Sequence, residues 1–120
     1  MNTDTHMTRT INDWKPETQS LIQTLFKHGL TIESVDNGEE ETNFDDVSLA
    51  NFIEQVMACD EAHLYVRAPD GKRKVLYLVY GNNPGELVVD YSVCAEIDAA
   101  TDEHYRNWEG KKQPTAEQNY

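Results

Sequence analysis

Residues 63–92 constrain the fold more than any other part of the chain. They contain three runs rich in β-branched and aromatic residues, separated by two turns that contain glycine or proline. This spacing is typical of an antiparallel meander, in which consecutive strands pair through short connections. The three runs span residues 63–68, 74–80 and 86–92.

The middle run predicts a central strand, because both of its faces are apolar. Alternation places Val75, Tyr77 and Val79 on one face and Leu76, Leu78 and Tyr80 on the other. We therefore expect this strand to be flanked on both sides and covered on both faces. The outer two runs alternate better, which predicts one sheet face that packs a core and one that is mixed and aromatic.

Two apolar repeats before the meander predict helices. The first helix runs from about Pro16 to His28, and Gly29 suits its C-terminal cap. The second helix starts after Asp45 or Asp46, either of which would cap it, and ends near Cys59. Its apolar residues recur at helical spacing and are Leu49, Phe52, Ile53, Val56 and Met57.

Two further segments complete the order of elements. Residues 31–35 predict a short strand, Asp36-Asn37-Gly38 predicts a turn, and residues 39–42 form either a polar edge strand or an acidic loop. A third helix, capped by Ser92 or Asp98, follows the meander and ends at Gly110, with a buried face of Ile97, Thr101, Tyr105 and Trp108.

The resulting order, α-β(β)-α-β-β-β-α, predicts an α+β fold. About three helices pack on an antiparallel meander sheet of three to five strands. We expect a single domain over residues 13–110, with a disordered N-terminal tail at 1–12 and a polar C-terminal tail at 111–120.

The charge of the chain restricts its partners. The 120 residues include 22 acidic and 10 basic ones, for a net charge of −12. This balance argues against direct binding of nucleic acid or of an anionic membrane surface, since both require clustered cations. It permits a basic protein partner. The two cysteines and the lack of a signal peptide indicate the cytoplasm.

Acidic residues gather in a tract that contains no lysine or arginine. Ten acids lie between His28 and Val66, and a second such tract, with six acids, runs from Val75 to Tyr105. A solvated surface is the ordinary explanation of such runs. The functional alternative is an acidic face that attracts a basic protein. Its candidate partner-binding residues are Glu39, Glu40, Glu41, Asp45 and Asp46.

Cys94 is the candidate nucleophile if the chain is an enzyme. It lies between a strand and a helix, where a helix N-terminus favours the thiolate. His104 would be its base, with Asp90 or Asp98 to orient the imidazole. Ten residues of helix place His104 about 15 Å from Cys94, which argues against direct pairing. A structural role for Cys94 is therefore favoured, and we expect no catalytic residue.

The sequence predicts no metal site and no cofactor. Cys59 and His63 straddle a junction between a helix and a strand, and no paired Cys-x-x-Cys motif is present. The acidic loop that starts at Asp36 lacks the glycine and the final carboxylate of a calcium-binding loop. Residues 81–85 contain two glycines, but they connect two strands and so form no phosphate cradle.

The leading functional hypothesis is a small, non-catalytic, cytoplasmic module that binds a basic protein. One specific version is an inhibitor that mimics DNA, as accessory proteins of mobile elements can. The sequence leaves two alternatives open: a small cysteine-dependent enzyme that uses Cys94, and a homo-oligomeric structural protein that pairs through an edge strand.

Overall fold

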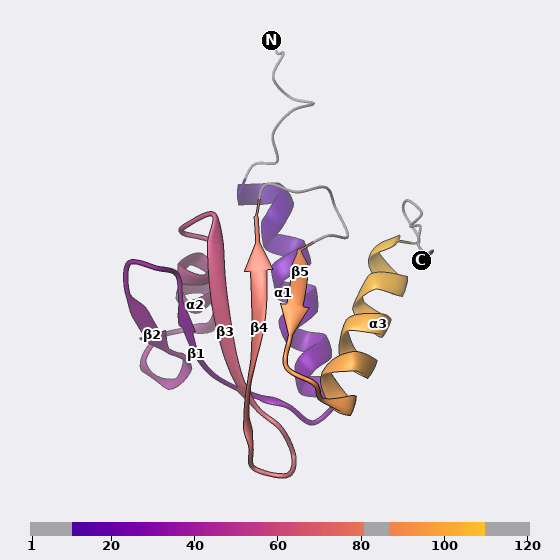
Figure 1. The fold of residues 1–120 in the computed structure, drawn as a ribbon. Helices are drawn as coiled ribbons and strands as arrows, with labels where there is room; N and C mark the ends of the chain where they lie inside the picture. The colour runs from indigo at the N-terminus through magenta and orange to yellow at the C-terminus, as the bar shows by residue number, and fades with distance from the viewer. Residues whose placement is uncertain (1–10, 81–86, 110–120) are drawn as a thin grey trace.

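The computed structural model describes residues 11–80 and 87–109. It contains three α-helices, one short 3-10 helix and five strands (Figure 1). In chain order the elements are α1 (Ile11–Lys27), β1 (Thr31–Asp36), β2 (Glu41–Asn43), η1 (Phe44–Asp46), α2 (Leu49–Val56), β3 (Glu61–Arg67), β4 (Arg73–Val79), β5 (Val88–Tyr91) and α3 (Ala95–Glu109).

The five strands form one antiparallel sheet in the order β2-β1-β3-β4-β5. The predicted α+β fold with a meander is therefore confirmed. The second half of the predicted β-hairpin near residue 40 is a strand, β2, rather than a loop, and it lies at one edge of the sheet. Of the two predicted meander turns, Asp70-Gly71 is present with Gly71 at φ +88°, whereas the turn at residues 83–86 lies outside the described residues.

Helices α1 and α2 lie behind the sheet in Figure 1 and cover its apolar face, and α3 lies beside the β5 edge, against α1. That face carries Leu64 and Val66 of β3 and Leu76 and Leu78 of β4, all completely buried. The opposite face is not covered by any helix in the described part of the chain. The expectation that β4 is covered on both faces was therefore wrong, because Val75, Tyr77 and Val79 remain half-buried on the uncovered face.

Helix α1 begins earlier than the sequence predicts. It starts at Ile11, so Pro16 lies inside the helix rather than in its first turn. Proline is favoured in a first turn, but a helix can continue past it at the cost of one backbone hydrogen bond. Of the tail expected over residues 1–12, residues 1–10 lie outside the described part. The predicted C-terminal end is confirmed, since Gly29 adopts φ +92°.

Helix α2 is capped by Ser48, not by Asp45 or Asp46. The Ser48 hydroxyl accepts the N–H of Asn51 at 3.1 Å, whereas both aspartates lie in η1, one turn earlier. Serine and aspartate are equally good caps, so the sequence alone gives two solutions. Aspartates in η1 do not perform the capping role, and their carboxylates remain exposed.

Helix α3 begins at Ala95, and neither predicted cap serves it. The Ser92 hydroxyl instead accepts the N–H of Val75, and Asp98 lies within the first turn and accepts the Tyr91 hydroxyl. The buried face of α3 includes Ile97 and Thr101 as predicted, together with Ala100 and His104. Tyr105 is half-buried, and the side chain of Trp108 lies outside the described part.

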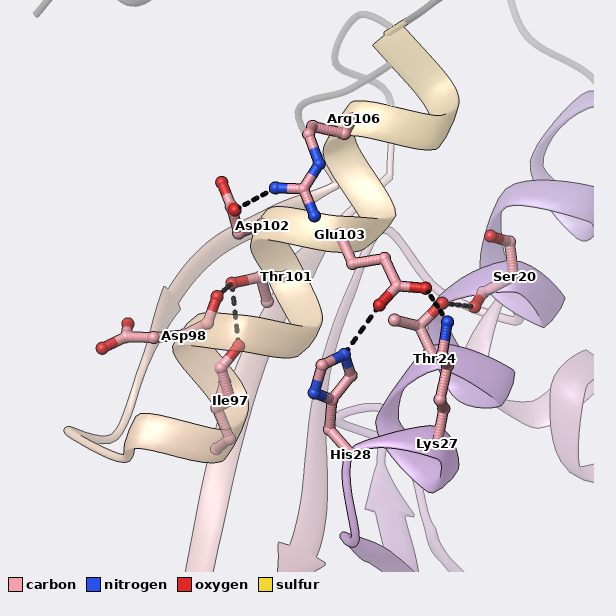
Figure 2. A network of polar contacts seen from close by, with 10 residues as sticks. All are labelled: Ser20, Thr24, Lys27, His28, Ile97, Asp98, Thr101, Asp102, Glu103 and Arg106. Atoms are coloured by element: carbon pink, nitrogen blue, oxygen red, sulfur yellow. Dashed lines mark hydrogen bonds and ion pairs between the residues drawn. The ribbon is translucent and has the colours of Figure 1, made fainter.

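The interface between α1 and α3 is partly polar, and Figure 2 shows its outer half. Glu103 of α3 accepts hydrogen bonds from Lys27 Nζ at 2.6 Å and from His28 Nε2 at 2.8 Å. Deeper in the interface, His104 and Glu17 are completely buried with Nε2 and Oε2 3.8 Å apart. The contacts attach α3 to α1 through charge as well as through apolar packing.

Candidate functional site

The five predicted partner-binding residues gather at the β2 edge of the sheet. Glu39 and Glu40 lie in the turn between β1 and β2, Glu41 begins β2, and Asp45 and Asp46 lie in η1. All five are exposed. They therefore flank or belong to β2, which is the edge strand at the left of the sheet in Figure 1.

Local hydrogen bonds hold the tip of this edge in place. The Asn37 side-chain oxygen accepts the N–H groups of Glu39 and Glu40, and its amide donates to the backbone of Gln55 in α2. Gly38 adopts φ +93°, a conformation that side-chain-bearing residues rarely take. The buried Asn37 therefore fixes the turn from below, and the side chains of Glu39 and Glu40 extend into solvent.

A groove of about 750 Å³ lies beside these acids. It is enclosed by the end of α1, the first half of β1, β2, η1 and the start of β4. Three of the predicted residues, Glu41, Asp45 and Asp46, line it, whereas Glu39 and Glu40 lie outside. Its volume is within the range of pockets that hold small ligands or short peptide segments.

Aromatic side chains form the apolar part of the groove. Phe26 at the end of α1 is 41% exposed and lies 5.8 Å from the ring of Phe44, measured between ring centroids. Phe44 in turn makes an edge-to-face contact with the buried Phe52, at 5.0 Å. The two outer rings are therefore supported from the core and present an apolar surface to the groove.

The carboxylates around the groove differ in whether a nearby cation compensates their charge. Glu33 accepts hydrogen bonds from Arg67 at 2.6 Å and from Arg73 at 3.0 Å, so its charge is compensated. Glu41 lies 3.8 Å from Arg73 and accepts the Ser34 hydroxyl. By contrast, Asp45 and Asp46 have no cationic partner among the described residues. Asp46 accepts a hydrogen bond from the Asn43 side chain at 3.2 Å.

Glu41 therefore has a local role that the sequence does not reveal. Its contacts with Ser34 and Arg73 join β2 to the neighbouring strands. Removing its charge would disturb this edge as well as any binding. Glu39 and Glu40 make no side-chain contact of this kind in the described structure, so they are better suited to test binding.

The uncovered sheet face is the second surface with functional chemistry. His63 stacks on Tyr77 with ring centroids 4.9 Å apart, and the Arg73 guanidinium lies 4.1 Å above the Tyr65 ring. The Tyr77 hydroxyl donates to Glu61 at 2.7 Å, and this carboxylate raises the pKa of the tyrosine. These side chains pair with one another, which favours a structural role for this face.

The second base-free tract lies away from the first. Its described acids are on β5 and α3, and β5 is at the opposite end of the strand order from β2. Figure 1 shows the two at opposite sides of the molecule. The two tracts therefore do not join across the sheet into one acidic edge.

The residues of the alternative cysteine enzyme are not brought together. The buried Cys94 thiol lies 3.4 Å from Glu96, and His104 contacts Ser20 and Glu17 of α1. Asp98 accepts the hydroxyl of Tyr91. The cysteine and the histidine are thus engaged in separate contacts.

Cys59 lies just after α2, close to acidic side chains. Burial, followed by the nearby carboxylates of Glu39 and Asp60, raises its pKa. Among the described residues, no three histidine, cysteine or acidic side chains gather as metal ligands would. The same part of the chain holds no helix with the length and apolarity needed to cross a membrane.

The aromatic part of the site was not predicted from the sequence. Helical spacing groups Phe26 with Leu21, Ile22 and Leu25 and so predicts that it is buried, whereas its side chain is 41% exposed. Phe44 stands alone in a polar segment, between Asn43 and two aspartates, and that context was the available signal. No protein-family model, curated protein or solved structure matches this chain.

Proposed function

We propose that this protein is a non-catalytic module that binds a basic partner protein through its β2 edge. The observation that carries the proposal is the arrangement of Glu39, Glu40, Glu41, Asp45 and Asp46. They are exposed on a single edge, beside a groove that also presents aromatic rings. Acidic residues that served only solubility would not need to gather at one edge or to lie beside a groove.

The electrostatics favour a protein partner over nucleic acid. A chain with a net charge of −12 repels phosphate backbones and attracts surfaces rich in lysine and arginine. Exposed charges act mainly on the rate of association, because they guide the approach of the partner before contact. We place this interaction in the cytoplasm, consistent with the two free thiols, Cys59 and Cys94.

A narrower version is that the partner normally binds DNA and that the acidic edge occupies its DNA site. Duplex DNA carries about one charge per 1.7 Å of its axis. Five exposed carboxylates lie within eight residues of the chain, so they present several negative charges over a short stretch, at a lower density than duplex DNA. Because the second acidic tract lies at the other edge, the mimic would cover a small DNA-binding surface rather than a long one.

The proposal is tested by capture from host lysate at low and high salt. The test variant is Glu39→Gln with Glu40→Gln, which removes two charges and leaves the contacts of Glu41 intact. Its matched control, Asp90→Asn with Asp102→Asn, removes two exposed charges on β5 and α3, away from the β2 edge and η1. We expect the wild type and the control to capture a basic protein at low salt, and the test variant to capture less.

Association kinetics on the captured protein complete the test. The Debye length falls from about 10 Å at 0.1 M salt to about 3 Å at 1 M, so steering by exposed carboxylates weakens over this range. The test variant should associate more slowly and with a flatter salt dependence than the control. Capture that responds to neither salt nor the variant would contradict the proposal. If duplex DNA competes with this protein for binding to the captured partner, the DNA-mimic version is supported. If the partner binds duplex DNA and this protein at the same time, that version is contradicted.

A further inference from the structure

The two edges of the sheet differ in how many of their outward-facing backbone N–H and C=O groups are already hydrogen-bonded or covered. At the β5 edge, the Tyr105 hydroxyl accepts the N–H of Val88 and donates to its carbonyl, both at 3.0 Å. Asp90 accepts the N–H of Tyr91 at 2.9 Å. These side chains occupy groups that an added strand would use, as is common at protected edges.

The opposite edge is protected over only part of its length. Strand β2 pairs with residues 34–36 of β1 and then ends, as the chain turns into η1. On that side, no described strand pairs with residues 31–33, and η1 contacts β1 without strand pairing. On the other side Thr31 and Ile32 pair with β3, and Glu33 is the unpaired residue of the bulge. A β-bulge between Ile32 and Ser34 marks the point where the pairing changes. Residues 31–33 line the groove.

The side chains around this open stretch differ between its two faces. Ile32 lies on the helix-covered face of the sheet, near Phe26 and Phe44, which also line the groove. Glu33 contacts the arginines of the uncovered face, so its side chain lies on that side. Since alternate residues of a strand point to opposite faces, a matching strand would alternate apolar and polar residues. Glu33 is already compensated by the arginines, so a basic residue of that strand would pair with Asp45 or Asp46 instead.

We infer that the groove binds a short extended segment of the basic partner, which adds as a strand along residues 31–33. This inference rests on the proposed function and specifies its partner. Apolar residues of the segment contact Phe26 and Phe44, and its lysines or arginines face the carboxylates of the groove. Asp45 and Asp46, which lack a cationic partner in the described structure, supply the charge complementarity. Main-chain hydrogen bonds supply affinity, and the alternating side chains supply specificity.

The test uses four capped hexapeptides and the amide spectrum of the 15N-labelled full chain. The first alternates arginine with valine. The second has the same composition in two blocks, three arginines followed by three valines, and the third alternates arginine with serine. The fourth is the first peptide with N-methyl groups on alternate residues, which removes the N–H groups on one of its edges without changing its charge.

The first peptide should shift the amide signals of residues 31–33 and bind more tightly than the other three. Loss of two main-chain hydrogen bonds should weaken binding by the N-methylated peptide about tenfold or more, provided that the methyl groups lie on the bonded edge. A fifth peptide, added as a control and methylated on the complementary set of residues, should then show a smaller loss of affinity. Equal binding by all the peptides, or shifts confined to other parts of the sheet, would overturn the inference.

Protein variants test the side-chain contacts separately. Asp45→Asn with Asp46→Asn should weaken binding of the first peptide about threefold to tenfold, because exposed ion pairs contribute modestly. The Asp90→Asn/Asp102→Asn control should bind it as the wild type does. Phe26→Ala, which removes an exposed ring, should reduce the preference for the valine peptide over the serine peptide. An unchanged preference in a folded variant would contradict the role of the ring.

The two proposals fail in different ways. If capture from lysate depends on Glu39 and Glu40 but the peptides do not shift residues 31–33, the basic partner is retained and strand addition is wrong. If neither experiment shows binding at the β2 edge, the proposed function itself is wrong.

Discussion

At the scale of single residues, the packing of aromatic side chains links the core to the candidate site. Phe52 is completely buried beneath Phe44, which contacts the exposed Phe26. The three rings form a continuous series from the interior to the groove. Burial of Phe52 therefore fixes the position of the apolar surface that a partner would contact.

Phe52→Ala should destabilise the protein by about 3–5 kcal/mol, through lost apolar burial and the cavity left behind. Leu49→Ala is the matched control on α2, since Leu49 is 41% exposed and should cost far less. Unfolding by denaturant measures both. A loss below about 1 kcal/mol for Phe52→Ala would mean that α2 is not docked in this position.

A second residue-scale prediction concerns Cys94, which tests the enzyme alternative. In a Cys59→Ser background, Cys94 is the remaining thiol of the chain. It is buried and its thiol contacts Glu96, so iodoacetamide should modify it slowly at neutral pH and rapidly in denaturant. Mass spectrometry over time measures the rate. Fast labelling that is already maximal below pH 7 would instead favour a reactive cysteine.

At the scale of elements, periodic sequence patterns predict the helices and strands. Features that depend on contacts between residues far apart in the sequence could not be predicted. The repeat through Phe52, Ile53 and Val56 predicts α2 because helical spacing alone puts these residues on one face. The choice of Ser48 as its cap depends on the path of η1, which the local pattern does not encode. The expectation that both faces of β4 are covered was wrong for the same reason. The side of the sheet on which each helix packs is not encoded in the pattern of β4 itself.

The candidate site was predictable to a similar extent. Its proposed charged residues form one cluster in the sequence, so composition alone was enough to select them as candidates. The groove was not, because it forms where Phe26 of α1, β1 and η1 meet, and these are separated along the chain. The role of Glu41 was also hidden, since its partner Arg73 lies 32 residues further on, in β4.

The α1–α3 interface carries a pH prediction that belongs to this scale. Hydrogen bonds from Lys27 and then His28 lower the pKa of Glu103 below its ordinary value. The unfolded chain therefore binds a proton to this group more readily than the folded protein. The resulting stability is present above the unfolded pKa and is lost as pH falls through the lower folded value.

Glu103→Gln should remove this contribution (Figure 2). The variant should be less stable than the wild type near pH 6, and the difference should shrink as the pH falls below about 4.5. Denaturant unfolding at a series of pH values measures it. Asp102→Asn is the control on the same helix, where it removes the exposed pair with Arg106 but leaves the α1–α3 contacts intact. A constant difference between Glu103→Gln and wild type at all pH values would contradict the assignment.

At the scale of the whole molecule, the sheet has two unlike ends. One end carries the five exposed carboxylates and the open stretch at residues 31–33, and the other is closed by α3. The side-chain protection of β5 argues against self-association through that strand. Helix α3 follows β5 directly in the chain and carries Tyr105, whose hydroxyl bonds the backbone of Val88 at the β5 edge.

Tyr105→Phe should therefore weaken the protection of the β5 edge. The change removes one hydroxyl and leaves the N–H and carbonyl of Val88 without their side-chain partner. Val89, which is 45% exposed on the same strand, adds an apolar contact for a second copy. Because an unpaired edge strand readily accepts another strand, the variant should self-associate more strongly with concentration than the wild type does. Sedimentation velocity at several concentrations measures this self-association, with His63→Ala, on the uncovered sheet face, as a control.

The wild type could instead already form a dimer that Tyr105→Phe leaves unchanged. In that case β5 is not the edge at which copies meet, and the open stretch of β1 becomes the candidate for self-pairing.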